Sequence, residues 1–122
     1  MALPHESLVA WQRADDLYVR VHAPSKTFPA DERYGLTSQL RRAAYSVAAN
    51  IVEGFARDSP RDRPQFLEIA LSSRCELGYG IHVSRRLEYI SEDIERELEA
   101  AVRAIDAPLR GLRQRYIGYR VE

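Results

Sequence analysis

Apolar side chains recur at intervals of three and four residues in four separate stretches of the chain. Such spacing places the side chains along one face of an α-helix. No stretch of useful length alternates between apolar and polar residues, as a half-buried β-strand would. The sequence therefore predicts an all-α protein with helices over about residues 5–22, 36–57, 60–89 and 92–116.

Prolines and capping residues indicate where these helices begin and end. Pro24 is expected to stop the first helix, because proline lacks a backbone donor. Ser59 suits the N-cap of the third helix, with Asp62 as the alternative, and Ser91 suits the N-cap of the fourth. Pro108 falls inside the fourth apolar pattern, where it removes one backbone hydrogen bond and predicts a kink.

The connections between the helices predict the architecture. Only about Tyr89 to Ser91 separates the third and fourth helices, so these two must be antiparallel neighbours. Four amphipathic helices bury their apolar stripes best against one another. We therefore expect residues 1–122 to form one domain, a single antiparallel up-and-down four-helix bundle.

Composition and charge narrow the class of protein. The chain is 45% apolar and 30% charged, as is usual for a soluble globular domain. It has no apolar run of the length that a membrane span needs, and we expect no secretory signal between Met1 and Trp11, where no basic start precedes an apolar stretch. Cys75 is the only cysteine, which favours a reduced, cytoplasmic setting. A net charge of zero argues against a surface devoted entirely to nucleic acid.

The residue types that carry metal, cofactor or catalytic chemistry are scattered. His5, His22 and His82 do not have the spacing of metal ligands, and Cys75 has no second cysteine to complete a site. The chain has no glycine-rich nucleotide loop. We expect no metal, no cofactor, no small-molecule substrate and no enzymatic activity.

A polar stripe adjoins the apolar stripe of the second helix. One interpretation is a solvated face, and the other is a hydrogen-bonded seam to the third helix or to another subunit. Asn50 favours the seam, because it continues the register of the apolar residues. We expect Asn50 and Glu53 to be buried, with Arg42 or a residue near Glu76 as partner. The stripe and its expected partner comprise Gln39, Arg42, Ser46, Asn50, Glu53 and Glu76.

Arginine accounts for 17 of the 18 basic residues, and it pairs with phosphate and carboxylate in a planar, bidentate way. The antiparallel course predicts that the start of the third helix and the end of the fourth lie at one end of the bundle. Asp58 and Asp62, in the connection between the second and third helices, weaken the positive field at this end of the bundle. The candidate nucleic-acid contacts are Arg57, Arg61, Arg63, Arg110, Arg113 and Arg115.

Several short motifs together carry a resemblance to a known family. The chain resembles the four-helix-bundle family of the 23S rRNA intervening-sequence proteins over roughly Leu8 to Tyr89. The fourth helix is similar only in its pattern. The matching residues are Val9-Ala-Trp11-Gln12, Phe28-Pro29, Glu32-x-Tyr34-Gly35-Leu36, Ser38-Gln39-x-Arg41-Arg42-Ala43-Ala44, Asn50-Ile-x-Glu53-Gly54 and Phe66-Leu-x-Ile-Ala70-x-x-Ser73-x-x-Glu76-Leu77.

This resemblance implies a small bacterial cytoplasmic protein that assembles into a ring-like homopentamer. A related group, the accessory proteins of diversity-generating retroelements, implies a partner such as a reverse transcriptase or nucleic acid. Two hypotheses remain open. In the first, a homo-oligomeric module binds RNA or a nucleic-acid enzyme through its arginines. In the second, the assembly has no nucleic-acid role, and the arginines pair with acids of a neighbouring subunit, such as those in residues 92–99.

The aromatic residues also favour self-association. One bundle of short helices can bury only part of this set, and aromatic side chains are enriched at interface cores. We therefore expect some of them to lie between subunits. The set comprises Trp11, Tyr18, Tyr34, Tyr45, Phe55, Phe66, Tyr79, Tyr89, Tyr116 and Tyr119.

Overall fold

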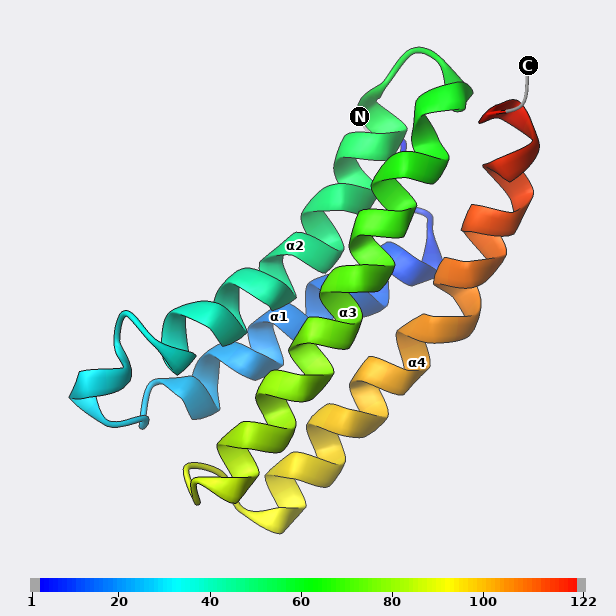
Figure 1. Cartoon of the computed structure of the whole chain (residues 1–122). Coiled ribbons are helices and arrows are strands. Elements are labelled where there is room, and N and C mark those ends of the chain that lie inside the picture. The colour runs from blue at the N-terminus through cyan, green and yellow to red at the C-terminus, as the bar shows by residue number, and fades with distance from the viewer. Residues whose placement is uncertain (1–2, 121–122) are drawn as a thin grey trace.

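A computed structural model describes residues 3–120, and the side chains of this range up to Gly118. Its helices are α1 (Val9–Ser25), α2 (Leu36–Ala56), α3 (Arg63–Arg86) and α4 (Glu92–Tyr116), with short 3-10 turns η1 (Ala30–Glu32), η2 (Pro60–Asp62) and η3 (Ile117–Arg120). Within residues 3–120 there is no strand. The chain runs up and down through four antiparallel helices (Figure 1). The predicted fold class is confirmed.

Each helix packs against two others. Helix α1 contacts α2 and α4, and helix α3 contacts the same two from the other side. The apolar stripes meet in the centre, where each helix contributes fully buried side chains such as Leu17, Val47, Leu77 and Ile105. Each such side chain stabilises the fold by about 1.5–3 kcal/mol relative to an exposed one. No helix in the described range is long and apolar enough to cross a bilayer.

Helix α1 differs from its predicted range at both ends. It begins at Val9, because residues 3–8 form turns in which the Leu8 amide donates to the His5 carbonyl at 3.0 Å. It also continues through Pro24 to Ser25, so the prediction that Pro24 stops it is wrong. A proline in the last turn removes only one helical hydrogen bond, and the Lys26 amide closes that turn on the Ala23 carbonyl at 3.2 Å.

Helix α3 is shorter than predicted. Ser59 accepts a hydrogen bond from the Arg61 amide at 3.3 Å, but this bond caps the 3-10 turn η2, and α3 itself begins at Arg63. The helix ends at Arg86, because Glu88 has a φ of 64°, in the left-handed region that breaks a helix. Helix α4 begins as predicted, and the Ser91 hydroxyl accepts from the Ile94 amide at 3.2 Å.

Helix α4 runs without a break through Pro108. Since proline has no amide hydrogen, the Ala104 carbonyl one turn earlier loses its helical donor. The Arg13 guanidinium of α1 supplies a replacement, donating from Nη1 to the Ala104 oxygen at 2.6 Å. The neighbouring helix therefore satisfies the backbone acceptor that Pro108 leaves open.

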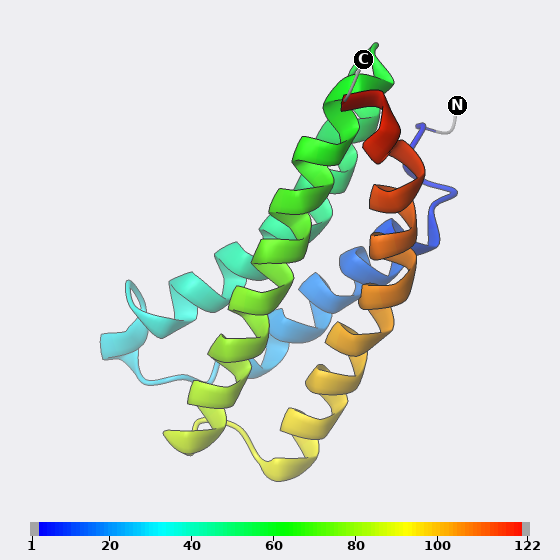
Figure 2. The ribbon, with the colours of Figure 1, turned by 45° about the vertical axis from the view of Figure 1, so that its right-hand side comes forward.

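Different connections meet at the two ends of the bundle. At one end, the α2–α3 connection lies beside the C-terminal turn η3 (Figures 1 and 2). At the other end, the α1–α2 connection and the α3–α4 turn are joined by Tyr89, whose hydroxyl donates to Glu32 Oε2 at 2.8 Å. The Tyr89 ring also packs against Phe28, with 5.2 Å between the ring centroids.

Candidate interaction surfaces

The polar stripe of α2 forms a seam with α3. The Ser46 and Ser73 hydroxyls are hydrogen-bonded at 2.7 Å, and Ser73 is buried. Arg42 donates to Gln39 at 2.7 Å and reaches Glu76 of α3 at 3.4 Å. This part of the stripe thus runs along the contact between two helices of the same chain.

Two members of the stripe differ from expectation. Asn50 is half-buried, but its amide donates to the Ser46 carbonyl at 2.8 Å and the Ser46 hydroxyl at 3.0 Å, not to Arg42 or Glu76. The expectation that Glu53 is buried is wrong for this chain, because its side chain is 54% exposed and pairs with Arg57 at 3.6 Å. Three residues along a helix leave a net offset of about 60°, so Glu53 stays on the same polar stripe but at its solvent-exposed edge.

The predicted meeting of arginines is found in part. Arg57, Arg61, Arg63 and Arg115, here called the arginine end, lie around the η2 and η3 turns, which contact each other. Arg110 and Arg113 lie further along α4, in a hollow of about 370 Å³ with Cys75 of α3. The six arginines therefore do not form one cluster.

The side chains of the arginine end differ in their contacts and in their exposure to solvent. The Arg63 guanidinium lies over the rings of Phe55 at 4.5 Å and Tyr116 at 4.9 Å, so it is already engaged in cation–π contacts within the chain. Arg57 lies over Phe66 at 4.9 Å and also pairs with Glu53. Arg61 is exposed. Arg63 therefore has a structural role, whereas Arg57, Arg61 and Arg115 are exposed to solvent.

A groove between α1 and α2 was not predicted from the sequence. It has a volume of about 470 Å³, and its lining includes the aromatic residues Trp11, Tyr18 and Tyr45 and the small residues Ala48 and Ala49. Tyr18 and Tyr45 meet edge to face across it, 5.9 Å between centroids. The signal in the sequence is the spacing of Trp11 and Tyr18, seven residues apart on one face of α1.

Several aromatic side chains remain uncovered in the single chain. Tyr45 is 61% exposed, Tyr79 is 69% exposed, and Tyr34 in the α1–α2 connection is 85% exposed. By contrast, Phe55 is buried, and Trp11 and Tyr18 are partly buried against the core. The Tyr119 side chain lies outside the described part of the chain.

Among the described residues, neighbouring carboxylates raise the pKa values of Tyr89 and Arg20. The pKa of Tyr89 is raised, chiefly by its hydrogen bond to Glu32, with desolvation as the second cause. The pKa of Arg20 is raised by its hydrogen bond to Asp16, at 2.6 Å. No three His, Cys, Asp or Glu residues of the described range gather in a way that could hold a metal ion.

Comparison with known proteins places this bundle in a family. The crystal structure of a protein of unknown function from the S23 ribosomal protein family of Bacteroides thetaiotaomicron shares the fold, with a TM-score of 0.79. It is 23% identical in sequence, and the match covers 87% of this chain and 99% of that one. No curated protein matches the chain. The family model described as 23S rRNA-intervening sequence protein matches residues 6–111. The chain therefore belongs to the family of 23S rRNA-intervening sequence proteins.

Proposed function

We propose that this protein is a non-catalytic module that works by associating with copies of itself. The observation that carries the proposal is the exposure of large apolar side chains on packed helices. Tyr45 of α2 and Tyr79 of α3 are each more than half exposed, and Ile69 of α3 is 42% exposed. Aromatic side chains are enriched in interface cores, and burying them removes apolar area from water.

The remaining features agree with a binding role in the cytoplasm. The shifted pKa values of Arg20 and Tyr89 are each explained by a carboxylate on the surface, without a catalytic partner. A single cysteine suits a reducing compartment. Five copies is the number that the family resemblance implies.

Mass in solution tests self-association. Light scattering coupled to size exclusion, at micromolar concentration, is expected to give a multiple of the 14.0 kDa chain mass. A particle of 14.0 kDa over the whole concentration range would overturn the proposal.

A second candidate function is the binding of RNA at the arginine end. The observation that favours it is the gathering of Arg57, Arg61 and Arg115 around two contacting turns. Symmetric copies would repeat this group, and repeated positive charge attracts a polyanion even at zero net charge. Asp58 and Asp62 lie in the same connection and reduce the attraction.

Binding of a single-stranded RNA oligonucleotide at several salt concentrations tests this candidate. The wild type is expected to bind with an affinity that falls steeply with salt, because phosphate contacts release counterions. Arg57→Gln/Arg61→Gln should lose that binding, whereas Arg33→Gln/Arg86→Gln, at the other end, should keep it. Absent or salt-insensitive binding would leave an assembly module with no nucleic-acid role.

A further inference from the structure

The groove between α1 and α2 has the chemistry of a site for a cationic side chain. Trp11, Asp15 and Tyr18 follow one another on α1 at intervals of four and three residues, so an acid lies between two aromatic rings. The faces of aromatic rings attract guanidinium and ammonium groups. The small alanines in the lining allow the backbone of a partner to approach closely.

All charged residues that line this groove are acids. Asp15 makes no hydrogen bond or ion pair within the described residues. Glu53 is paired only with Arg57, at 3.6 Å and exposed to solvent, where such pairs are weak. Because Tyr45 is 61% exposed, this side of the groove is open to solvent. The groove therefore suits a protein segment that presents a basic side chain.

The outward face of α4 offers such a segment. Arg96, Arg103 and Arg110, here called the arginine ladder, repeat every seven residues and lie on one side of the helix. Neighbouring arginines of the ladder are about 10.5 Å apart along the axis of α4, because an α-helix rises 1.5 Å per residue. Trp11 and Tyr18 are also seven residues apart, so the spacing of cations matches the spacing of rings.

The surroundings of the ladder suit close packing. Ala100, Ala107 and Gly111 lie beside the arginines and are exposed, so the residues on this side of the ladder are small. Arg96 pairs with Glu92 at 3.0 Å, Arg103 with Glu99 at 3.9 Å and Arg110 with Asp106 at 2.8 Å, all within one helix and at least partly exposed. These pairs are weak enough to rearrange when a stronger acceptor is offered.

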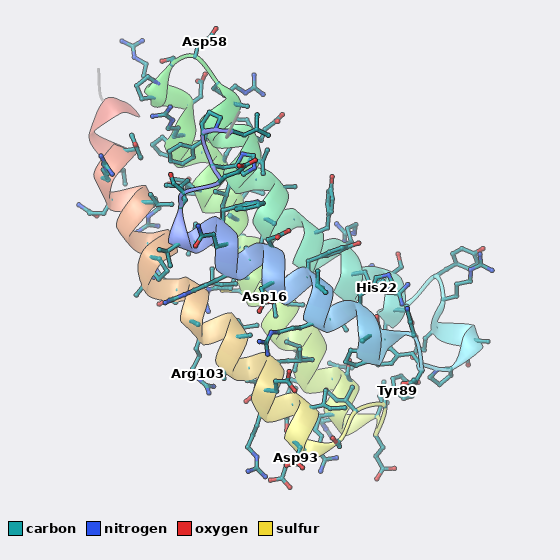
Figure 3. The ribbon with its side chains drawn as sticks, turned by 180° about the vertical axis from the view of Figure 1, so that it is seen from behind. Asp16, His22, Asp58, Tyr89, Asp93 and Arg103 are labelled. Atoms are coloured by element: carbon teal, nitrogen blue, oxygen red, sulfur yellow. The ribbon has the colours of Figure 1, made fainter. Side chains whose placement is uncertain are left out.

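The groove and the ladder lie on different sides of the bundle. Helix α4 packs against α1 and α3, whereas the groove is formed by α1 and α2. Arg103 extends away from the bundle (Figure 3), and its side chain is 71% exposed. A copy therefore cannot fill its own groove with its own ladder, but a second copy can.

From this complementarity we propose that the occupant of the α1–α2 groove is the arginine ladder of a second copy of this chain. Asp15 and Glu53 accept from the guanidinium groups, and Trp11, Tyr18 and Tyr45 pack against them. The contact is head-to-tail, so each copy offers its ladder to one neighbour and receives the ladder of another in its groove. The assembly then either closes into a ring or extends as an open chain of subunits. This inference rests on the proposed self-association and names its two surfaces.

Complementary variants test the proposal. Asp15→Asn/Tyr45→Ala damages the groove, and Arg96→Gln/Arg103→Gln damages the ladder. All four side chains are exposed in the single chain, so both variants should fold, as circular dichroism can verify. Each variant alone should associate at least tenfold more weakly than the wild type. Arg33→Gln/Arg86→Gln is the matched control, and it should associate as the wild type does.

Mixing the two damaged variants gives the sharper result. The groove variant keeps an intact ladder and the ladder variant keeps an intact groove, so an equimolar mixture should form a 1:1 pair of twice 14.0 kDa and no larger species. Trp11 is the only tryptophan, so its fluorescence reports on the groove directly. Acrylamide should quench it more strongly when the wild type is diluted into single chains.

The outcomes separate this inference from the proposed function. A wild type that is a single chain at all concentrations would overturn both. A wild-type oligomer whose mass is unchanged in the groove and ladder variants, with Trp11 equally accessible before and after dilution, would overturn the groove–ladder contact alone. Self-association would then use another surface.

Discussion

At the residue scale, the seam between α2 and α3 contains two kinds of polar contact. Ser46 and Ser73 share a short hydrogen bond at 2.7 Å, and Ser73 is buried. Arg42 and Glu76 are 3.4 Å apart, but both side chains are at least half exposed. Solvent competes with the second contact and not with the first, so the hydroxyl pair should contribute more to stability.

Double-mutant cycles measure this difference. The cycle of Ser46→Ala with Ser73→Ala is expected to give a coupling free energy of about 0.5–1.5 kcal/mol in urea unfolding. The cycle of Arg42→Ala with Glu76→Ala should give less than about 0.5 kcal/mol. A larger coupling for the ion pair than for the hydroxyl pair would contradict this ranking.

Ionisation of the Tyr89 hydroxyl should lower the stability of the fold at alkaline pH. Its pKa is raised above 10.0 by the hydrogen bond to Glu32, so the folded state holds this proton more tightly than the unfolded state does. The contribution is complete below pH 10 and is lost as the pH rises through the raised pKa. Tyr89→Phe should therefore be less stable than the wild type at pH 8 and lose less stability on going to pH 11.

Urea unfolding at these two pH values tests the prediction, with Tyr34→Phe as the control. Tyr34 is 85% exposed, so Tyr34→Phe should lose as much stability between pH 8 and pH 11 as the wild type does. If Tyr89→Phe loses as much stability at high pH as the wild type does, the hydrogen bond to Glu32 is not the cause.

At the scale of the element, α4 depends on its neighbour. Pro108 leaves the Ala104 carbonyl without a helical donor, and Arg13 of α1 replaces it at 2.6 Å. Arg13→Ala should lower the free energy of unfolding by about 0.5–1.5 kcal/mol. In the Pro108→Ala background, the new amide hydrogen can donate to Ala104, so Arg13→Ala should have almost no effect.

Thermal or urea unfolding of the four proteins in this cycle gives the coupling free energy. Arg20→Ala serves as the control, because Arg20 pairs with Asp16 and Glu97 and not with the α4 backbone. Its effect should be the same in both backgrounds. An Arg13→Ala effect that does not change with Pro108→Ala would show that Arg13 acts by some other contact.

At the scale of the whole molecule, stacked arginines close one end of the bundle. Arg63 bridges Phe55 of α2 and the end of α4, since its guanidinium lies over both Phe55 and Tyr116. Arg63→Ala is expected to lower the free energy of unfolding by about 1–2 kcal/mol, because two partly desolvated cation–π contacts are lost. Arg61→Ala, at an exposed position, should stay within about 0.5 kcal/mol of the wild type.

Urea unfolding of these variants and of Arg63→Lys tests this role. Lysine keeps the charge but lacks the planar guanidinium, so it should recover only part of the loss. Equal effects of Arg63→Ala and Arg61→Ala would contradict the assignment of different roles to the two arginines.

The sequence by itself determined the class of fold, the four helices and the family, because helical periodicity and short motifs are local properties of the chain. It predicted the Ser91 cap correctly, since an N-cap needs only residues within one turn. Where prediction failed, at Pro24, Glu53 and the last turn of α3, the outcome depended on small rotations and backbone angles that spacing does not specify.

Only the tertiary structure decided which side chains from distant parts of the chain meet. Arg13 reaches Ala104, Arg63 lies between two rings, and α1 and α2 enclose a groove with an acidic and aromatic lining. Each of these depends on the rotation and separation of packed helices, which a one-dimensional pattern leaves open. The fold therefore follows from local periodicity, whereas the candidate interaction surfaces follow from how the helices pack.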